Sequence, residues 1–379
     1  MFHERHFALE FAFMRIGIDL RLPYYQMGGI SQYALHLLPA LAALDAENHY
    51  VALQMRKDEV LRVPEAANFR RANVRTPCHH RLERWSLSAE IIPHRFDVLH
   101  SPDFIPPRYG AKRHIITVHD LNFLYYPQYL TAESRRYYND QIEWAVERAD
   151  LISADSHHTR QDLIEQLNVP PEKVKTVHLA ANPIYERGYG SAEIEQTLAQ
   201  HNLPRDFLLF VGTIEPRKNL PTLLRAYYDL RHDAGIELPL VLVGRRGWLS
   251  DDVFALIEQL QLTQCVRHLT GIFDEQLAHL YHAAALLVLP SHYEGFGLPP
   301  LEAMHCGCPI VTSDRGSLPE IVGDAGFLLD ADDIPIWIDT LYHVLQDSNV
   351  RAKMIERGSA QAKCFSWEQT ARATLNLYR

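Results

Sequence analysis

The sequence has no hydrophobic run long enough to cross a membrane. Every apolar stretch is shorter than the about 20 consecutive residues that a bilayer-spanning helix requires. The apolar patch within residues 1–13 is interrupted by Glu10, and no small-residue cleavage site follows it, unlike in a secretory signal peptide. We therefore expect residues 1–13 to be an N-terminal extension and the protein to be cytoplasmic.

The sequence also contains few cysteines, and it has fewer Lys and Arg than Asp and Glu residues. Five scattered cysteines among 379 residues do not form the even, closely spaced set of a disulfide framework, which agrees with a reducing compartment. Cys306 and Cys308 could form a metal or redox pair, but no second ligand pair stands at zinc spacing, which favours a buried turn. A net charge of −10 and a pI of about 6.1 argue against nucleic acid as a partner.

What the sequence does contain is a regular alternation of short apolar runs and helical stretches. The expected strands are Arg15–Asp19, Tyr50–Met55, Asp97–His100, His114–His119, Leu151–Ala154, Lys175–Leu179, Phe207–Val211, Leu238–Val243, Val266–Leu269, Leu286–Leu289, Pro309–Thr312 and Phe327–Leu329. The expected helices are Ser31–Leu44, Thr131–Arg148, Thr159–Leu167, Pro221–His232, Asp252–Gln261, Asp274–Ala284, Pro300–His305 and Ile334–Gln346. This order predicts an α/β fold with two Rossmann-like domains built on parallel sheets.

A polar stretch rich in glycine and proline, Asn182–Pro204, separates the two halves. We expect a first domain at residues 14–185, a linker at 186–204 and a second domain at 205–364. The last segment, residues 365–379, is amphipathic and is expected to form a final helix.

Two glutamates, Glu294 and Glu302, bracket a segment rich in glycine and proline after an expected strand. The glycines allow close approach to the backbone, and Pro299 and Pro300 suit the first turn of a helix. A helix start offers N–H groups to an anion, while carboxylates accept hydrogen bonds from sugar hydroxyls. In isolation this pattern is more often a solvated loop. Its place at the carboxyl end of a strand favours a site for a sugar attached to a phosphate.

Two adjacent cations, Arg217 and Lys218, follow another expected strand. Asn219 is expected to cap the next helix, with Pro221 in its first turn. Because adjacent cations repel each other, a nearby anion is the favoured explanation, and each charge-assisted hydrogen bond to it contributes about 1.5–3 kcal/mol. The alternative is a solvated basic turn.

Two weaker signals lie in the first half. Gly28 and Gly29 stand between the first strand and the first helix, where they form an ordinary turn or an anion cradle. His119 ends an expected strand at the same edge of the first sheet, with Asp120 beside it as a residue that could orient the ring. A lone histidine at such a place is more often structural.

In these motifs the chain resembles the GT-B-fold retaining glycosyltransferases of family 4, also called glycosyl transferases group 1. The resemblance rests on Glu294–Glu302 and on Gly212–Leu220, and it is strongest between residues 207 and 329. It implies two facing Rossmann-like domains, an acceptor-side domain followed by a domain that binds the nucleotide sugar. It also implies that the last helix crosses back to the first domain.

The resemblance implies a role for each motif. His119, Glu294, Arg217 and Lys218 are the expected catalytic residues: the cations bind the donor diphosphate, and His119 and Glu294 contact the donor sugar. Glu302 is expected to accept the ribose hydroxyls. The full set of expected donor-binding residues is Gly28, Gly29, Gly212, Arg217, Lys218, Arg245, Ile272, Phe273, Glu294, Phe296, Gly297, Leu298 and Glu302.

No metal and no cofactor besides the donor are expected. Asp330-Ala331-Asp332 matches the D-x-D pattern of metal-dependent glycosyltransferases. Its place after the last short strand favours a helix cap instead, and Arg217 and Lys218 supply the charge that a divalent ion would bring.

The expected function is that of a retaining hexosyltransferase in the synthesis of cell-surface polysaccharide such as lipopolysaccharide. The Glu-Pro-Arg-Lys-Asn motif is similar to that of bacterial mannosyltransferases, so GDP-mannose is the first expected donor and a UDP-hexose the second. The acceptor is a saccharide or a lipid-linked saccharide. The alternatives are a sugar-nucleotide epimerase of the same fold and a non-catalytic sugar-nucleotide-binding subunit.

The stretch Arg56–Arg84 has a local net charge of +4 in an otherwise acidic protein. Most such stretches are solvated faces. This one could also contact an anionic membrane surface or a lipid-diphosphate acceptor, which leaves peripheral association with the inner face of the cytoplasmic membrane open.

Overall fold

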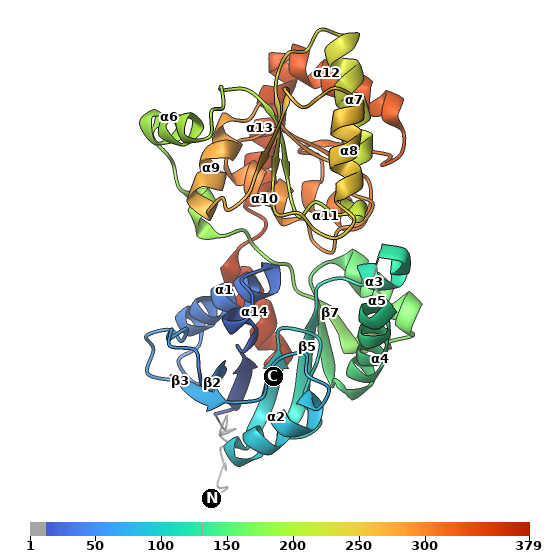
Figure 1. Cartoon of the computed structure of the whole chain (residues 1–379). Coiled ribbons are helices and arrows are strands. Elements are labelled where there is room, and N and C mark those ends of the chain that lie inside the picture. The colour runs from blue at the N-terminus through green and yellow to red at the C-terminus, as the bar shows by residue number, and fades with distance from the viewer. Residues whose placement is uncertain (1–12, 130–131) are drawn as a thin grey trace, which may run out of the picture. The chain divides into compact units, whose positions relative to one another are not determined.

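The computed structural model describes residues 13–129 and 132–379 and divides into two compact units (Figure 1). The first unit comprises Met1–Val118, Ile142–Ser153 and Ala371–Arg379. The second comprises His119–Gln141 and Ala154–Thr370. The N-terminal extension expected at residues 1–13 lies, apart from Phe13, outside the described residues.

The first sheet has seven strands in the order β3-β2-β1-β4-β5-β6-β7. The strands are β1 (Arg15–Asp19), β2 (His49–Met55), β3 (Phe69–Val74), β4 (Phe96–Ser101), β5 (Ala111–Val118), β6 (Leu151–Ala154) and β7 (Val174–Thr176). The strands from β3 to β5 pair in parallel, as the βα alternation predicts. The longer helices that connect these strands are α1 (Gly29–Leu44), α2 (Glu83–Ile91), α4 (Ala132–Arg148) and α5 (His157–Leu167).

The second sheet has six parallel strands in the order β10-β9-β8-β11-β12-β13. The strands are β8 (Leu208–Val211), β9 (Leu240–Val243), β10 (Val266–Leu269), β11 (Leu286–Leu289), β12 (Ile310–Ser313) and β13 (Phe327–Leu329). The four central strands are buried along their whole length, which explains their continuous apolar sequences. The chain winds outward in one direction from β8 and in the other from β11, so the topological switch point lies between these two strands.

Helices cover both faces of the second sheet (Figure 1). On one face lie α7 (Leu220–His232), α8 (Asp251–Gln259) and α12 (Ile334–Gln346), and α7 packs against both of the others. On the opposite face lie α9 (Asp274–Ala283), α10 (Leu298–His305) and α13 (Ser348–Ala362). The short helix α11 (Leu318–Val322) follows β12. The core beneath α7 and α12 contains Phe210, Leu242 and Trp337.

The structure adds elements that the sequence analysis did not assign. Strand β3 has the mixed sequence Phe-Arg-Arg-Ala-Asn-Val and lacks an apolar run. Helix α6 (Ser191–Gln200) lies within the segment expected to be a linker, and it buries Ile194 and Leu198 against α9. Its polar composition hides a narrow apolar face, and this is why the pattern of the sequence alone did not reveal a helix.

The last helix, α14 (Trp367–Tyr378), has its first residues in the second unit and the remainder, from Ala371, in the first unit. In the second unit, the Trp367 indole N–H donates to the Ala181 carbonyl at 2.8 Å. In the first unit, the buried Tyr378 hydroxyl lies 2.7 Å from Nδ1 of His100. No helix among the described residues is long and apolar enough to cross a membrane.

Candidate active site

The candidate site lies at the topological switch point of the second sheet. Because β8 and β11 are parallel neighbours, their carboxyl ends open onto the same edge, where such sheets bind ligands. The loop after β8 leads through a short 3-10 helix, Pro216–Lys218, into α7. The loop after β11 carries Glu294 into α10. The two strongest sequence motifs are therefore brought together.

Arg217, Lys218 and Glu294 form one hydrogen-bonded cluster with Ser291 and Glu215. The Lys218 ammonium donates to Oε1 of Glu294 at 2.6 Å, and the Ser291 hydroxyl donates to the same oxygen at 2.7 Å. Nη1 of Arg217 donates to Oε2 of Glu294 at 3.1 Å, and Nε of Arg217 pairs with Glu215. Lys218 and Glu294 are buried, with 5% and 6% of their surface exposed. The fold thus supplies two carboxylates as counter-charge for the adjacent cations.

The cluster fixes the charge of its members. Burial alone would raise the pKa of Glu294, but the positive charges of Lys218 and Arg217 lower it to about 2. Burial lowers the pKa of Lys218, as does Arg217, while Glu294 opposes both effects. Glu294 is consequently ionised at neutral pH and acts only as a hydrogen-bond acceptor. A sugar hydroxyl can donate to it, and it cannot serve as a general acid.

The backbone around Glu294 is held tightly from two sides. The Ser317 amide donates to the Glu294 carbonyl at 3.0 Å, and the Ser317 hydroxyl donates to the Phe296 carbonyl at 2.6 Å. Nη1 of Arg217 also donates to the Tyr293 carbonyl at 3.0 Å. These bonds preorganise the loop, so the charged groups need little rearrangement to meet a ligand.

His119 follows β5 directly and is oriented by Asp155, which the sequence analysis missed. Nδ1 of His119 lies 2.5 Å from Oδ2 of the buried Asp155. Burial raises the pKa of Asp155, while the charge of His119 and its hydrogen bond lower it. Asp120, the orienting residue expected from the sequence, instead accepts hydrogen bonds from the backbone and side chain of Asn122. Asp155 directly follows β6, so its place at a strand end was a signal that could have revealed it.

A glycine allows the His119 backbone to lie against the Glu294 loop. A Cβ atom added to Gly295 would lie 2.1 Å from the His119 carbonyl oxygen. The Ser156 hydroxyl, beside Asp155, donates to the Gly295 carbonyl at 2.8 Å. The structure thus brings His119 and Glu294, two of the four expected catalytic residues, onto adjoining segments.

Glu302 lies on α10, directly after its first turn. Oε2 of Glu302 accepts a hydrogen bond from the Tyr281 hydroxyl at 2.8 Å. Burial raises the pKa of Glu302 to about 7, although the Tyr281 hydrogen bond opposes the rise and Asp274 adds to it. The helix begins after Gly297, whose φ of 101° suits glycine, and the N–H groups of Gly297 and Leu298 stand at its start. The Phe296 side chain is buried, so only its backbone is available to a ligand.

The remaining expected donor residues lie at other strand ends. Gly212 follows β8 with a φ of 153°, and Arg245 lies exposed after β9. Ile272 and Phe273 follow β10, and the Phe273 ring is 75% exposed. Gly28 and Gly29 belong to the first unit, where Gly28 caps α1 and Gly29 begins it.

The D-x-D segment does not cap the next helix as expected. Asp333, one residue later, caps α12 through a hydrogen bond from the Ile336 amide at 3.2 Å. Asp330 accepts from the Asp332 amide at 2.9 Å and pairs with Arg315 at 2.9 Å. Asn219 stands at the N-cap position of α7, but its side chain bonds Ala331 and Thr222 and caps no amide.

A second hydrogen-bonded network anchors the residue before Glu294. The Tyr293 hydroxyl donates to Oδ2 of Asp162 at 2.6 Å, and the Tyr125 hydroxyl donates to the other carboxylate oxygen at 2.6 Å. Burial raises the pKa of Tyr293, and the negative charges of Asp120 and Asp162 raise it further, so the phenol remains a donor. Asp162 contacts Tyr293 because α5 lies close to the loop after β11 in the fold. No local sequence pattern shows that proximity.

Two family models match the chain. The model "Glycosyltransferase Family 4" matches residues 27–183, and the model "Glycosyl transferases group 1" matches residues 193–361. The chain is 37% identical over 302 residues to the O-antigen chain mannosyltransferase B of Escherichia coli, covering 79% of this chain and 78% of that protein. It is 31% identical over 240 residues to the serotype-specific mannosyltransferase WbdA of Escherichia coli, covering 62% of this chain but only 29% of WbdA.

Solved structures share the fold. Sucrose-phosphate synthase from Thermosynechococcus elongatus superposes with a TM-score of 0.75 at 22% identity, covering 97% of this chain and 98% of that one. Anabaena HepE in complex with UDP-glucose superposes with a TM-score of 0.73 at 17% identity, covering 96% and 99%. The fold is GT-B, as the sequence predicted.

Proposed function

The chain belongs to family 4 of the glycosyltransferases, and from that premise we propose that it transfers a hexose with retention of configuration and without a divalent metal. The donor is a nucleotide-diphosphate sugar. GDP-mannose is the first candidate, because two relatives are mannosyltransferases, and a UDP-hexose is the second. The acceptor is a saccharide or lipid-linked saccharide of a cell-surface polysaccharide.

The observation that carries this proposal is the cluster of Arg217, Lys218 and Glu294 at the switch point. Two cations and an ionised carboxylate are held in fixed geometry beside the start of α10. The cations would stabilise the charge that develops on the departing diphosphate, and Glu294 would accept hydrogen bonds from the sugar. Before the donor binds, the charge of Glu294 would keep the buried site close to neutral. Once the donor is bound, Glu294 and the phosphates would share the cations.

Four further residues complete the proposed donor site. The N–H groups of Gly297 and Leu298 at the start of α10 would bind a phosphate oxygen. Glu302, in its ionised form, would accept the ribose hydroxyls. The exposed ring of Phe273 offers a surface on which a nucleobase can stack.

In the proposed reaction, the bond between the anomeric carbon and the phosphate oxygen breaks, and the acceptor oxygen bonds to the anomeric carbon on the same face. The acceptor proton passes to the departing phosphate oxygen, so no protein base is needed. His119, held by Asp155, would contact the donor sugar and keep it in place.

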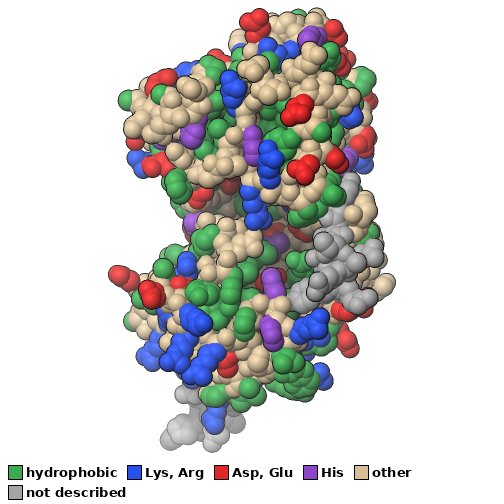
Figure 2. All heavy atoms as spheres, in the orientation of Figure 1, with side chains coloured by type: hydrophobic (Ala, Val, Ile, Leu, Met, Phe, Trp, Pro, Cys, Tyr) green, Lys and Arg blue, Asp and Glu red, His purple; other side chains and the backbone are tan. Residues whose placement is uncertain are grey.

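We also propose that the first unit makes peripheral contact with an anionic membrane. The stretch Arg56–Arg84, which follows β2 and includes β3, contains more Lys and Arg than Asp and Glu. Figure 2 shows Lys and Arg side chains gathered in this part of the first unit. Leu61, Leu82 and Trp85 of the same unit are exposed to 66%, 61% and 54%. Cations beside exposed apolar side chains are the combination that binds anionic lipid.

The deciding experiment measures transfer and thermal stability with a panel of sugar nucleotides. A bound donor raises the melting temperature by mass action, and GDP-mannose is expected to raise it most. Arg217→Ala is expected to slow transfer about 100-fold or more. Arg246→Ala, which alters an exposed arginine stacked on Phe254 at 3.6 Å, is the matched control.

Each outcome of this experiment separates the proposal from its rivals. Near-normal turnover of the Arg217 variant would contradict the proposal that Arg217 binds the donor diphosphate. Release of a rearranged free sugar without acceptor would indicate an epimerase, and binding without turnover would indicate a non-catalytic subunit. Activity that is lost on chelation and restored by magnesium or manganese would refute metal independence.

A further inference from the structure

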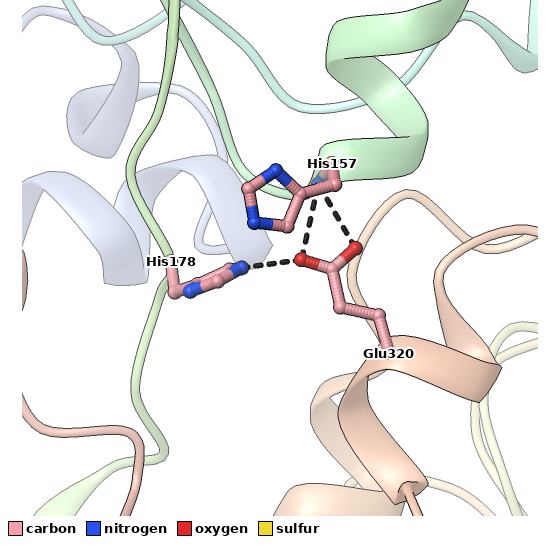
Figure 3. A group of neighbouring side chains, drawn as sticks. All are labelled: His157, His178 and Glu320. Atoms are coloured by element: carbon pink, nitrogen blue, oxygen red, sulfur yellow. Dashed lines mark hydrogen bonds and ion pairs between the residues drawn. The ribbon is translucent and has the colours of Figure 1, made fainter.

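His157, His178 and Glu320, none of which belongs to the cation cluster, converge on one point (Figure 3). His157 is the first residue of α5, His178 follows β7, and Glu320 lies on α11. All three belong to the second unit. One potential ligand atom from each side chain lies within 4.8 Å of the others. We propose that these three side chains bind a divalent transition-metal ion of the zinc type.

The donor set matches the chemistry of such an ion. Two imidazoles and one carboxylate form a common three-residue ligand set for zinc, which leaves one position open to water. Imidazole ligands favour zinc and its transition-metal neighbours over magnesium and calcium, which prefer oxygen. Ligand atoms about 2.1 Å from one ion lie at most about 4.2 Å apart. The exposed His157 ring can close the remaining gap by rotating.

The surrounding contacts already orient two of the three ligands. The His157 amide donates to both oxygens of Glu320, at 3.0 and 2.9 Å, which fixes the plane of the carboxylate. Nδ1 of His157 lies 3.0 Å from the Thr176 hydroxyl. When Nδ1 carries the proton and donates it to Thr176, the other ring nitrogen turns its lone pair toward His178 and Glu320 (Figure 3).

In the absence of an ion, Nε2 of His178 pairs with Oε1 of Glu320. Metal binding would replace the hydrogen bond between these two atoms, and the ion would be held by the unprotonated Nε2 of His178 and by the carboxylate of Glu320. The ion would then join the start of α5, the segment after β7 and helix α11. Ser156 and Ser317, which hold the Glu294 loop, lie on two of these segments, so the ion would stiffen the support of that loop.

Calorimetric titration of the chelator-treated chain with zinc chloride tests the proposal. We expect one tight equivalent of zinc, and a rise of several degrees in the melting temperature when free zinc exceeds Kd about 100-fold. His178→Ala and Glu320→Gln should abolish the tight equivalent. Thr176→Val, which removes only the partner of Nδ1, should weaken zinc binding about 10–100-fold.

His232→Ala is the matched control, because it removes an exposed histidine of α7 outside the cluster and should leave the tight equivalent unchanged. Cobalt in place of zinc gives a second readout, since a site with nitrogen ligands and low symmetry produces visible absorption. Circular dichroism establishes that each variant is folded. Equal zinc binding by the folded His178 and Glu320 variants, or the absence of a tight equivalent in the unmodified chain, would overturn the proposal and show only a histidine–glutamate ion pair.

Discussion

The Lys218 ammonium lies 2.6 Å from Oε1 of Glu294, and both side chains are buried. These residues are 76 positions apart in the chain, on the two loops that flank the switch point. Within the buried cluster each supplies much of the other's counter-charge, so the two motifs depend on each other for stability as well as for function. Their effects on stability should therefore be coupled.

Replacing one member of the pair should cost more than replacing both. We expect Lys218→Met to lower the free energy of unfolding by about 3–5 kcal/mol, because a buried carboxylate loses its closest cation. The double variant Lys218→Met/Glu294→Gln should recover at least half of this loss, since no unpaired charge remains. Urea denaturation of the four members of the cycle measures both quantities.

Arg225→Met is the control for this cycle, because Arg225 is an exposed cation on α7. Its effect on the free energy of unfolding should be within about 0.5 kcal/mol. Additive losses in the two single variants would show that Lys218 and Glu294 are not energetically coupled. That result would contradict the interpretation of these residues as one preorganised cluster.

The sequence predicted the parts of this site but not their pairing. Buried parallel strands have continuous apolar sequences, so β8 and β11 and the loops after them were recognisable from local composition. The bond between Lys218 and Glu294 arises because β8 and β11 are neighbours in the sheet, which local composition does not encode. Asp155 was missed for a similar reason, since its role depends on the pairing of segments 36 residues apart.

Elements with mixed composition were the other source of omissions. Strand β3 and helix α6 bury only part of one side each, so apolar residues do not predominate: β3 has as many polar as apolar residues, and α6 has more polar ones. The metal-ligand cluster has no sequence signature either. His157, His178 and Glu320 come from three separated segments and meet only in the folded chain.

Glu302→Gln should stabilise the protein at alkaline pH. The pKa of Glu302 in the folded protein is about 7, against about 4.5 for an ordinary glutamate. Because the pKa of Glu302 is higher in the folded than in the unfolded chain, the contribution of Glu302 to the free energy of unfolding is most favourable below about pH 4.5. This contribution falls between about pH 4.5 and pH 7 and is lowest above pH 7. Glutamine removes this loss, so the variant should gain about 1–3 kcal/mol at pH 8 and very little at pH 5.

Chemical denaturation at the two pH values gives the difference directly. Glu258→Gln, which alters an exposed glutamate of α8, should show no comparable pH-dependent gain. A gain of equal size at pH 5 and pH 8 would mean that Glu302 keeps an ordinary pKa. Donor affinity should fall in the Glu302 variant, because an amide is a weaker acceptor for ribose hydroxyls than a carboxylate.

Gly295→Ala should separate His119 from the Glu294 loop. The added Cβ would lie 2.1 Å from the His119 carbonyl oxygen, so one of the two segments must move. We expect a loss of about 1–3 kcal/mol in the free energy of unfolding, together with slower transfer. Gly188→Ala is the control, because Gly188 is exposed and its Cβ would meet no described atom within 4 Å. A Gly295 variant as stable and active as the Gly188 variant would contradict the close approach.

The new glycosidic bond should retain the anomeric configuration of the donor. Glu294 has a pKa of about 2 and is bonded to Lys218 and Arg217, so it is a poor proton acceptor and suits a ligand for the sugar. The acceptor proton can pass to the departing phosphate when the acceptor approaches from the phosphate's own face. That route retains the configuration, and an α-linked donor should therefore give an α-linked product.

The structure also contains the group that an inverting route would need. His119 is held by the buried Asp155, an arrangement that elsewhere allows histidine to act as a general base. Proton NMR of the product formed from an α-linked donor distinguishes the two routes through the anomeric coupling constant. A β-coupling would assign the base to His119 and overturn retention. With retention, Asp155→Asn should raise the donor KM, because Asp155 then only orients the ring, and kcat should not acquire the pH dependence of a histidine base.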